Sequence, residues 1–349
     1  MTRTAKRKRT WKNLFGINRG AQKTSANAVG QGRFSRQMAI DPLEERRLLT
    51  LQYNLTPIGD ISGGDFESGA LGINELGQVT GFSVNGVDPV LMSVDTQVGV
   101  TYSYPGPITS IGEFTSGDLG AYGNDINNAG YIVGKGVGQA NLGGGFDHTD
   151  FTAVPGSGDR ALLWNPNTTS WTDLGDFAGG NVAAEAHGIN NNNVVVGTSA
   201  DANSFRAFVW TDSGGLFKIP HSAGFLANGN SVAYAINDAG VVVGMAETSA
   251  NNYSPFYYDT EAVSPTMVKV DGGTVDAGNS FTRMLDINEN GFAVGHALYT
   301  ESGESILTPA GWQLYDSEGV FINDPEPVPL FDLLPDPGLP EVAGVGIAH

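Results

Sequence analysis

The chain has 349 residues, no Cys, and 18 Lys and Arg against 37 Asp and Glu, a formal net charge of −19 at pH 7. The absence of thiols excludes disulfides and thiolate metal sites, and no segment approaches the ~20 apolar residues of a membrane span. Residues 1–50 hold 12 of the basic side chains and three acids, which leaves 6 basic and 34 acidic side chains in residues 51–349; such an acidic body argues against a nucleic-acid partner.

Residues 1–50 are expected to form a disordered basic leader. They combine Lys and Arg with Ser, Thr, Gln and Gly and show no apolar periodicity. The stretch from Trp11 to Ile17 is too short and too polar for the 7–15-residue apolar core of a typical secretory signal. A targeting role for this leader therefore needs another signal.

A short motif at 42–50 supplies one. It resembles the LEPR-x-LL motif near the start of large exported proteins of planctomycetes and some other bacteria, although Glu45 stands in place of its Pro. The matching residues are Leu43, Glu44, Arg46, Leu48 and Leu49. The resemblance implies an exported or cell-surface protein. The alternative is a short amphipathic helix, because Leu43, Arg46 and Leu49 are spaced by three.

From residue 51 onward a repeat organises the sequence. One nonamer occurs five times. It begins with Ile and Asn, continues with two variable residues and then Gly or Asn, and ends with a run rich in β-branched residues that closes on Gly. Its copies are INELGQVTG (73–81), INNAGYIVG (126–134), INNNNVVVG (189–197), INDAGVVVG (236–244) and INENGFAVG (287–295). The spacing of about 50 residues is typical of propeller and solenoid arrays.

Each nonamer predicts a β-hairpin with a four-residue turn. The fourth turn residue should adopt a left-handed conformation, which Gly permits and Asn tolerates best among other residues. The Asn side chains should bond their own backbone as Asx turns. The predicted turn residues are Asn74 and Gly77, Asn127 and Gly130, Asn190 and Asn193, Asn237 and Gly240, and Asn288 and Gly291.

Two further strands follow each hairpin. Aromatic strands are predicted at 160–165, 206–211, 254–259 and 311–316, with a weaker one at 89–94. Closing strands are predicted at 108–113, 170–176, 216–221, 267–272 and 330–336. Four antiparallel strands in about 50 residues make one propeller blade. The expected fold over 51–349 is an all-β array, most simply an incomplete five- to six-bladed β-propeller.

The repeat also carries a family resemblance. The string AHGINNNNVVVGTS (186–199) followed by RAFVWT (206–211) resembles the HAF family of probable extracellular repeats. In that family an Ile-Asn turn precedes an Ala-Phe-x-Trp strand, matched here by Ala207, Phe208 and Trp210. The resemblance covers roughly residues 53–347 and implies an extracellular setting. Its motifs are structural and supply no catalytic residue.

Partial repeats flank the five whole ones. Residues 55–59 (LTPIG) read as a closing strand, and residues 341–349 (EVAGVGIAH) read as a lead strand with Ile347 in register and Ala348 in place of Asn. These segments could contribute to a sixth blade, or remain loose strands beside five.

Two groups of residues are weak metal candidates. Asp286, Asn288 and Asn290 fit the first half of a calcium loop, but Ala297 occupies the position of its bidentate Glu. The Gly-rich insertion 135–159 contains Asp147, His148 and Asp150, which could ligate a metal or form an acid–base pair. A hairpin turn and a solvated loop are the simpler interpretations.

These patterns favour a non-catalytic extracellular or cell-surface repeat protein that acts as a binding or structural scaffold. No catalytic or cofactor-binding residue is predicted, and Ca²⁺ is the one cofactor considered. An extracellular glycan or protein is the expected partner. The alternatives are a polysaccharide-active propeller enzyme and a calcium-dependent adhesin.

Overall fold

A computed structural model describes residues 68–85, 96–103, 109–112, 120–137, 158–179, 183–250, 252–272, 281–301 and 304–330. These residues form 20 β-strands, and none of them forms an α-helix. No helix in this part of the chain could span a membrane.

The strands fall into five units of four. Within each unit, every strand pairs antiparallel with the next strand in the sequence. The first strands, here called lead strands, are β1 (Ser68–Ile73), β5 (Gly120–Ile126), β9 (Ala184–Ile189), β13 (Ser231–Ile236) and β17 (Arg283–Ile287). The second are β2 (Gln78–Asn85), β6 (Ile132–Val137), β10 (Val195–Ala200), β14 (Val241–Ser249) and β18 (Phe292–Glu301). The third are β3 (Thr96–Ser103), β7 (Arg160–Asn165), β11 (Phe205–Thr211), β15 (Asn252–Asp259) and β19 (Glu304–Gln313). The fourth are β4 (Thr109–Gly112), β8 (Ser170–Asp173), β12 (Gly215–Lys218), β16 (Val268–Lys269) and β20 (Val328–Pro329).

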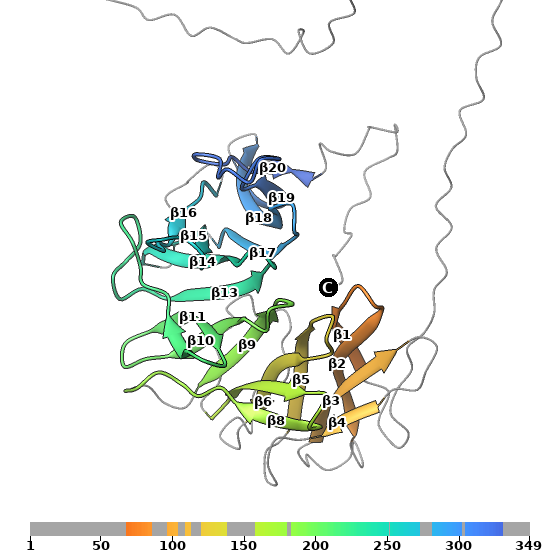
Figure 1. Ribbon diagram of the computed structural model, residues 1–349. Coiled ribbons are helices and arrows are strands. Elements are labelled where there is room, and N and C mark those ends of the chain that lie inside the picture. Colours follow the sequence, from red (N-terminus) through yellow and green to blue (C-terminus); the bar gives the residue numbers. More distant parts are fainter. Residues whose placement is uncertain are drawn as a thin grey trace, which may run out of the picture. The chain divides into compact units, whose positions relative to one another are not determined.

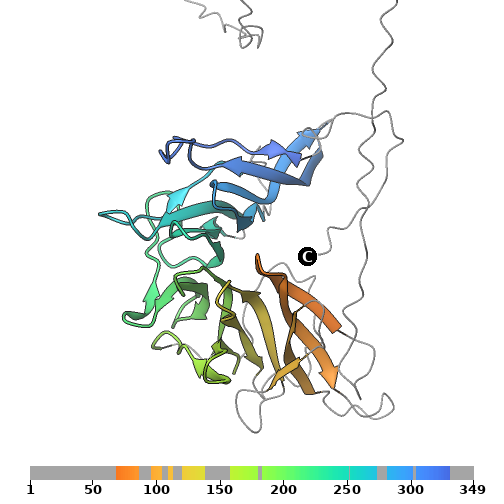
Figure 2. The same cartoon turned by 45° about the vertical axis from the view of Figure 1, so that its right-hand side comes forward.

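These units are the blades that the repeat predicts, and the fold class is confirmed. Figures 1 and 2 show each unit beside the next in chain order. Units one and two share one eight-stranded sheet because a single parallel pair, Gln97 with Gly120, links β3 to β5. The other three units are separate four-stranded sheets.

Two strand predictions were wrong in position. The third strand of unit one is β3, at 96–103, whereas the aromatic pattern predicted 89–94, which lies outside the described residues. The fourth strand of unit five is β20, at 328–329, just before the predicted 330–336. In both places the repeat pattern marked the segment, whereas the described strand that pairs with its neighbour lies beside it.

The five turns have the expected backbone. Gly77, Gly130, Gly240 and Gly291 have φ of 75°, 80°, 81° and 72°, and Asn193 takes the same conformation with φ 58°. Each turn is closed by a bond from the amide of this residue to the carbonyl of the turn Asn, for example Gly240 N to Asn237 O at 3.0 Å.

Each lead strand carries a β-bulge two residues before its terminal Ile. The extra residues are Leu71, Asn124, His187, Tyr234 and Leu285. The bulge explains the second Gly of the nonamer, which lies against a lead-strand carbonyl. A Cβ on Gly197 would lie 2.1 Å from the Glu185 carbonyl oxygen, and one on Gly244 would lie 2.0 Å from that of Val232. A side chain at this position is therefore excluded by the bulged pairing.

The apolar core lies between successive units. Ile236 of unit four shares a cluster with Val196 and Val209 of unit three. Ile189 of unit three shares one with Val133 and Leu163 of unit two. The lead-strand Ile of units two to five thus packs on the unit before it, which is the nearest-neighbour stabilisation of a repeat array, whereas Ile73 of unit one is exposed.

Several expectations fall outside the described residues. They are the leader 1–50 with its motif at 42–50, the flanking segments 55–59 and 341–349, and most of the insertion 135–159. They stay predictions.

Candidate functional site

Polar side chains gather where the three middle lead strands bulge. Units one and five carry Leu71 and Leu285 at the bulge, whereas the middle units carry Asn124, His187 and Tyr234. A bulge redirects a side chain and is common beside functional sites. We call Asn124, Lys135, Glu185, His187 and Tyr234 the lead-strand cluster.

Glu185 is the hub of this cluster. Its Oε1 accepts a hydrogen bond from Asn124 Nδ2 at 2.9 Å, and its Oε2 lies 3.2 Å from Lys135 Nζ. The same Asn124 amide donates to the carbonyl of Ala186. Asn124 and Lys135 belong to unit two and Glu185 to unit three, so the contacts cross the boundary between units.

The Lys135–Glu185 pair is held in its charged form. Burial disfavours both charges, but Lys135, His187 and Asn124 lower the pKa of Glu185 below its usual value. Burial likewise opposes the charge on Lys135, while Glu185 and Asp159 raise its pKa overall. The carboxylate is therefore a fixed hydrogen-bond acceptor at neutral pH and no proton donor.

His187 is neutral at physiological pH. Burial lowers its pKa, and the opposing effect of Glu185, whose Oε1 is 3.9 Å from His187 Nδ1, does not restore it. Its Nε2 lies 3.3 Å from Thr198 Oγ1. The centre of the His187 ring lies 5.7 Å from that of the Tyr234 ring. Burial raises the pKa of Tyr234 to about 12, which keeps its phenol protonated.

Asp125 lies beside this cluster. Its Oδ1 accepts the Ile126 amide at 2.8 Å and its Oδ2 accepts the Ile189 amide of the next unit at 2.9 Å. Burial, with a smaller contribution from the Asp286 carboxylate, raises the pKa of Asp125 to about 7 despite the lowering effect of the two amides. Asp125 thus joins two units and titrates near neutral pH.

The turn Asn residues form a ladder along the array. The side-chain amides of Asn74, Asn127, Asn190 and Asn237 each donate to the carbonyl of the turn Asn in the next unit, over 2.9–3.2 Å. Their Oδ1 atoms accept amides of their own turns, as Asx turns should. These residues therefore do two tasks, forming the turn and joining the units.

A second set of bonds runs beside the ladder. The amide of the residue after each turn Asn donates to the side-chain oxygen of its equivalent in the next unit: Glu75 to Asn128, Asn128 to Asn191, Asn191 to Asp238 and Asp238 to Glu289. In units two to five the first variable turn position is thus occupied by a side chain with an acceptor oxygen.

Two of the three calcium candidates, Asp286 and Asn288, accept hydrogen bonds from backbone amides. Asn288 Oδ1 accepts the amides of Asn290 and Phe292, and Asp286 Oδ1 accepts the amide of Ile287. Among the described residues no group of three His, Asp or Glu side chains is placed to hold a metal ion. Asp147, His148 and Asp150 lie outside the described residues.

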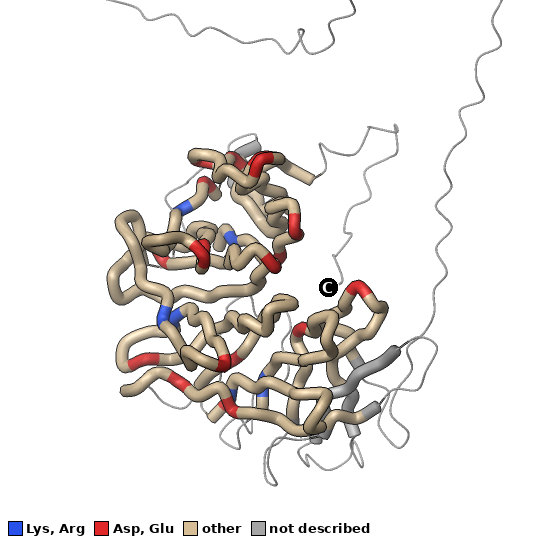
Figure 3. The backbone as a smooth tube through the Cα atoms, in the orientation of Figure 1, with Lys and Arg blue, Asp and Glu red and all other residues tan. Residues whose placement is uncertain are grey.

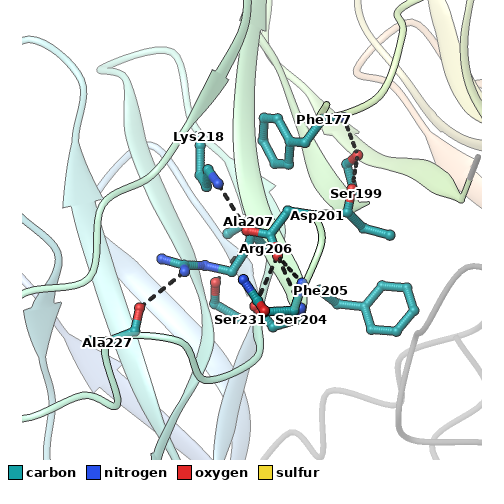
Figure 4. Close-up of polar contacts among 12 residues, drawn as sticks. Phe177, Ser199, Asp201, Ser204, Phe205, Arg206, Ala207, Lys218, Ala227 and Ser231 are labelled. Carbon is teal, nitrogen blue, oxygen red and sulfur yellow. Dashed lines mark hydrogen bonds and ion pairs between the residues drawn. The ribbon is translucent and has the colours of Figure 1, made fainter. Parts of the chain in front are cut away.

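Another polar group lies at the β10–β11 connection (Figure 4). Asp201 accepts hydrogen bonds from Lys218 Nζ at 2.8 Å and from the amides of Asn203 and Ser204. Burial alone would raise the pKa of Asp201, but these bonds outweigh that effect and lower it to about 2. Arg206 Nη1 donates to the carbonyl of Ala227, 3.1 Å away. These contacts order the connection and attach it to the loop before unit four, which is a structural role.

Acidic positions are spread along the described part of the chain. Figure 3 shows acidic positions in every described unit and few basic ones. The lead-strand cluster is an exception to the acidic background because Lys135 lies within it.

Sequence reasoning missed the lead-strand cluster. Glu185 and His187 occupy lead-strand positions that differ from repeat to repeat, so alignment of the nonamers does not reveal them. The available signal was the residue two before each Ile, which is polar in three of five copies.

A family model described as "Protein of unknown function (DUF3466)" matches residues 181–325, which begin at unit three and end in unit five. No curated protein matches the chain.

Among solved structures, TolB from Acinetobacter baumannii aligns with TM-score 0.37 and 9% identity over 68% of this chain and 50% of that one. Porphyromonas gingivalis dipeptidyl peptidase 4 aligns with TM-score 0.37 and 12% identity, over 66% and 30%. The Aleuria aurantia lectin AAL, solved with a fucosylated GlcNAc, aligns with TM-score 0.29 and 13% identity, over 76% and 97%. The chain spans half or less of the first two proteins, and such distant similarity assigns no activity.

Proposed function

We propose that this protein is a non-catalytic, exported or cell-surface scaffold that binds an extracellular glycan at the lead-strand cluster. The observation that carries the proposal is the hydrogen bonding of Glu185. Its carboxylate is ionised and fixed by Asn124 and Lys135, so it can accept bonds but cannot deliver a proton.

The chemistry of the cluster favours a neutral, hydroxyl-rich ligand. Asn124 and the protonated Tyr234 are neutral, and the charges of Lys135 and Glu185 compensate each other. His187 adds a neutral ring whose nitrogens can donate or accept. A site with hydrogen-bond donors, acceptors and an aromatic ring suits sugar hydroxyls, and the Arg283 guanidinium bonded to Tyr234 adds a further donor.

The binding test uses isothermal calorimetry of the full chain with a panel of neutral and acidic oligosaccharides. We expect a neutral oligosaccharide to bind, and Glu185→Gln to weaken binding because it removes the Lys135 partner and rearranges the acceptor. Asp212→Asn removes an exposed carboxylate elsewhere and is the matched control. Equal affinities for both variants, or no binding by any sugar, would reject the glycan assignment.

Export is tested separately. Fractionation of the native host with N-terminal sequencing of the mature protein should find the chain outside the cytoplasm, cleaved near the 42–50 motif. An intact N-terminus in the cytoplasmic fraction would contradict export without affecting the binding test.

A polysaccharide-active enzyme is the second candidate, and Asp125 favours it. Its pKa of about 7 leaves a protonated fraction at neutral pH, while Glu185 nearby on the next lead strand is ionised. Glycosidases use one protonated and one ionised carboxyl group. Release of reducing ends from a glycan by the wild type, lost in Asp125→Asn, would replace the scaffold proposal with this one.

A further inference from the structure

The hydrogen-bonding groups that join successive units are left open at the end of unit five. Asn74, Asn127, Asn190 and Asn237 are buried, with exposed fractions of 9%, 3%, 4% and 2%, and each donates its amide to the next turn. Asn288 is exposed, and its Nδ2 has no partner among the described residues.

A second open group lies two residues earlier. Asp125 and Asp286 occupy the same position, directly before the terminal Ile of the lead strand, and each uses Oδ1 to accept the amide of that Ile at 2.8 Å. Asp125 uses Oδ2 to accept Ile189 N of the next unit. Asp286 is exposed, and its Oδ2 has no partner within the described chain.

Together the two groups specify what they bind. In the junction of units two and three, Asp125 accepts the amide of Ile189 and Asn127 donates to the carbonyl of Asn190. The two contacts reach backbone atoms of two consecutive residues, the last of the following lead strand and the turn Asn after it. The same pair at unit five therefore requires a strand end, and the residue after its Ile can have any side chain.

The chain contains a segment with this pattern at the right distance. Ile126, Ile189, Ile236 and Ile287 lie 14, 16, 18 and 18 residues after the last residue of the preceding fourth strand, which is Gly112, Asp173, Lys218 and Lys269 in turn. Ile347 lies 18 residues after Pro329, which ends β20. Val342–Ile347 (VAGVGI) precedes Ala348, whose carbonyl would serve as well as that of Asn.

We propose that residues 342–348 dock against unit five as the lead strand of a further unit. The amide of Ile347 donates to Asp286 Oδ2, and the carbonyl of Ala348 accepts from Asn288 Nδ2. The Ile347 side chain then packs against unit five, as Ile126, Ile189, Ile236 and Ile287, all at most 7% exposed, pack against the units before them.

Thiol labelling of the full chain tests this, because the protein has no Cys. An Ile347→Cys variant should react with a thiol reagent about tenfold or more slowly than Val263→Cys, whose parent side chain is fully exposed. Ile236→Cys, at a buried equivalent position, gives the slow limit.

The specific contacts are tested in the Ile347→Cys background. Asn288→Asp keeps the turn acceptor and removes the amide donor, and Asp286→Asn removes the charged acceptor; each should speed labelling severalfold. Asn290→Asp adds the same charge to an exposed neighbour and should leave the rate unchanged. Circular dichroism confirms that each variant folds.

Two results would overturn the proposal. One is labelling of Ile347→Cys at the rate of Val263→Cys, which would mean that the segment is not docked. The other is protection that disappears on dilution of the protein, which would assign the open groups of unit five to a second copy of the chain.

Discussion

The side-chain amide of Asn190 donates to the main-chain carbonyl of Asn237, 47 residues further along the chain and 3.0 Å away. The same side chain uses Oδ1 to accept the amides of Asn192 and Val194 in its own turn. One buried Asn thus closes a hairpin and joins two units, which no other side chain of its size can do because both an acceptor and donors are needed.

Asn190→Asp should therefore destabilise the protein. The carboxylate keeps the acceptor for the turn but loses the donor and faces the Asn237 carbonyl from a buried position, so we expect a loss of about 1–3 kcal/mol in the free energy of unfolding. Asn228→Asp, at an exposed position, is the chemical control. Denaturant melts of the two variants measure the difference, and similar midpoints would show that the ladder contributes nothing.

The turn glycines allow backbone strain to be separated from steric overlap. Gly77 and Gly240 have φ of 75° and 81°, but a Cβ on Gly77 would meet no atom within 4 Å, whereas one on Gly240 would lie 2.4 Å from Thr260 Oγ1. Gly77→Ala should cost about 1–2 kcal/mol from positive φ alone. Gly240→Val should cost more, since it adds the overlap.

The companion substitution is Asn193→Gly. Because Asn193 already holds φ at 58°, Gly should be close to neutral in thermal unfolding. An effect of Asn193→Gly as large as that of Gly77→Ala would mean that the Asn side chain, which accepts Asn127 Nδ2 at 2.7 Å, matters more than the backbone conformation.

A matched pair of aromatic residues tests where the core lies. Phe208 on β11 is fully buried between units two and three, whereas Phe217 on the adjacent β12 is 53% exposed. Phe208→Ala should lower the free energy of unfolding by about 3–5 kcal/mol through lost burial and a cavity. Phe217→Ala should change it by less than about 1 kcal/mol. Comparable losses in urea melts would contradict this core assignment.

How far the sequence predicts this molecule depends on which features repeat. Asn237 and Gly240 recur in register, and the physical needs of a tight turn translate directly into those residue types. The bulge was not predicted. Its sequence signal is the second Gly of every nonamer, such as Gly244, which lies opposite the lead strand. The reason for this Gly cannot be deduced from the sequence, because the carbonyl that a Cβ would overlap belongs to another strand.

The candidate site was out of reach for a different reason. Glu185 and His187 belong to unit three and Asn124 and Lys135 to unit two, 50–63 residues earlier. Asn124 and His187 share the bulge position, but Glu185 and Lys135, which form the ion pair, occupy positions that the repeat does not relate. Their meeting depends on the packing of one unit on the next. The sequence instead favours the long insertion 135–159 as a place for function, because long loops commonly carry it.

The pH dependence of stability should reveal Asp125. Its folded-state pKa of about 7 exceeds the unfolded value of about 4, so folding takes up a proton, and its contribution to stability falls as the pH rises between those values and is constant above them. The lowered pKa values of His187 and His221 act in the opposite direction below about pH 6.5.

The raw slope of stability against pH therefore mixes these groups, and the comparison with Asp125→Asn isolates the carboxyl. We expect the melting temperature of the wild type, measured relative to that of Asp125→Asn, to fall from pH 5 to about pH 7.5 and then to level off. Asp212→Asn, which removes an exposed carboxyl group, should track the wild type throughout. A constant difference between wild type and Asp125→Asn across this range would show that Asp125 is ionised in the folded protein, and that its bonds to Ile126 and Ile189 outweigh burial.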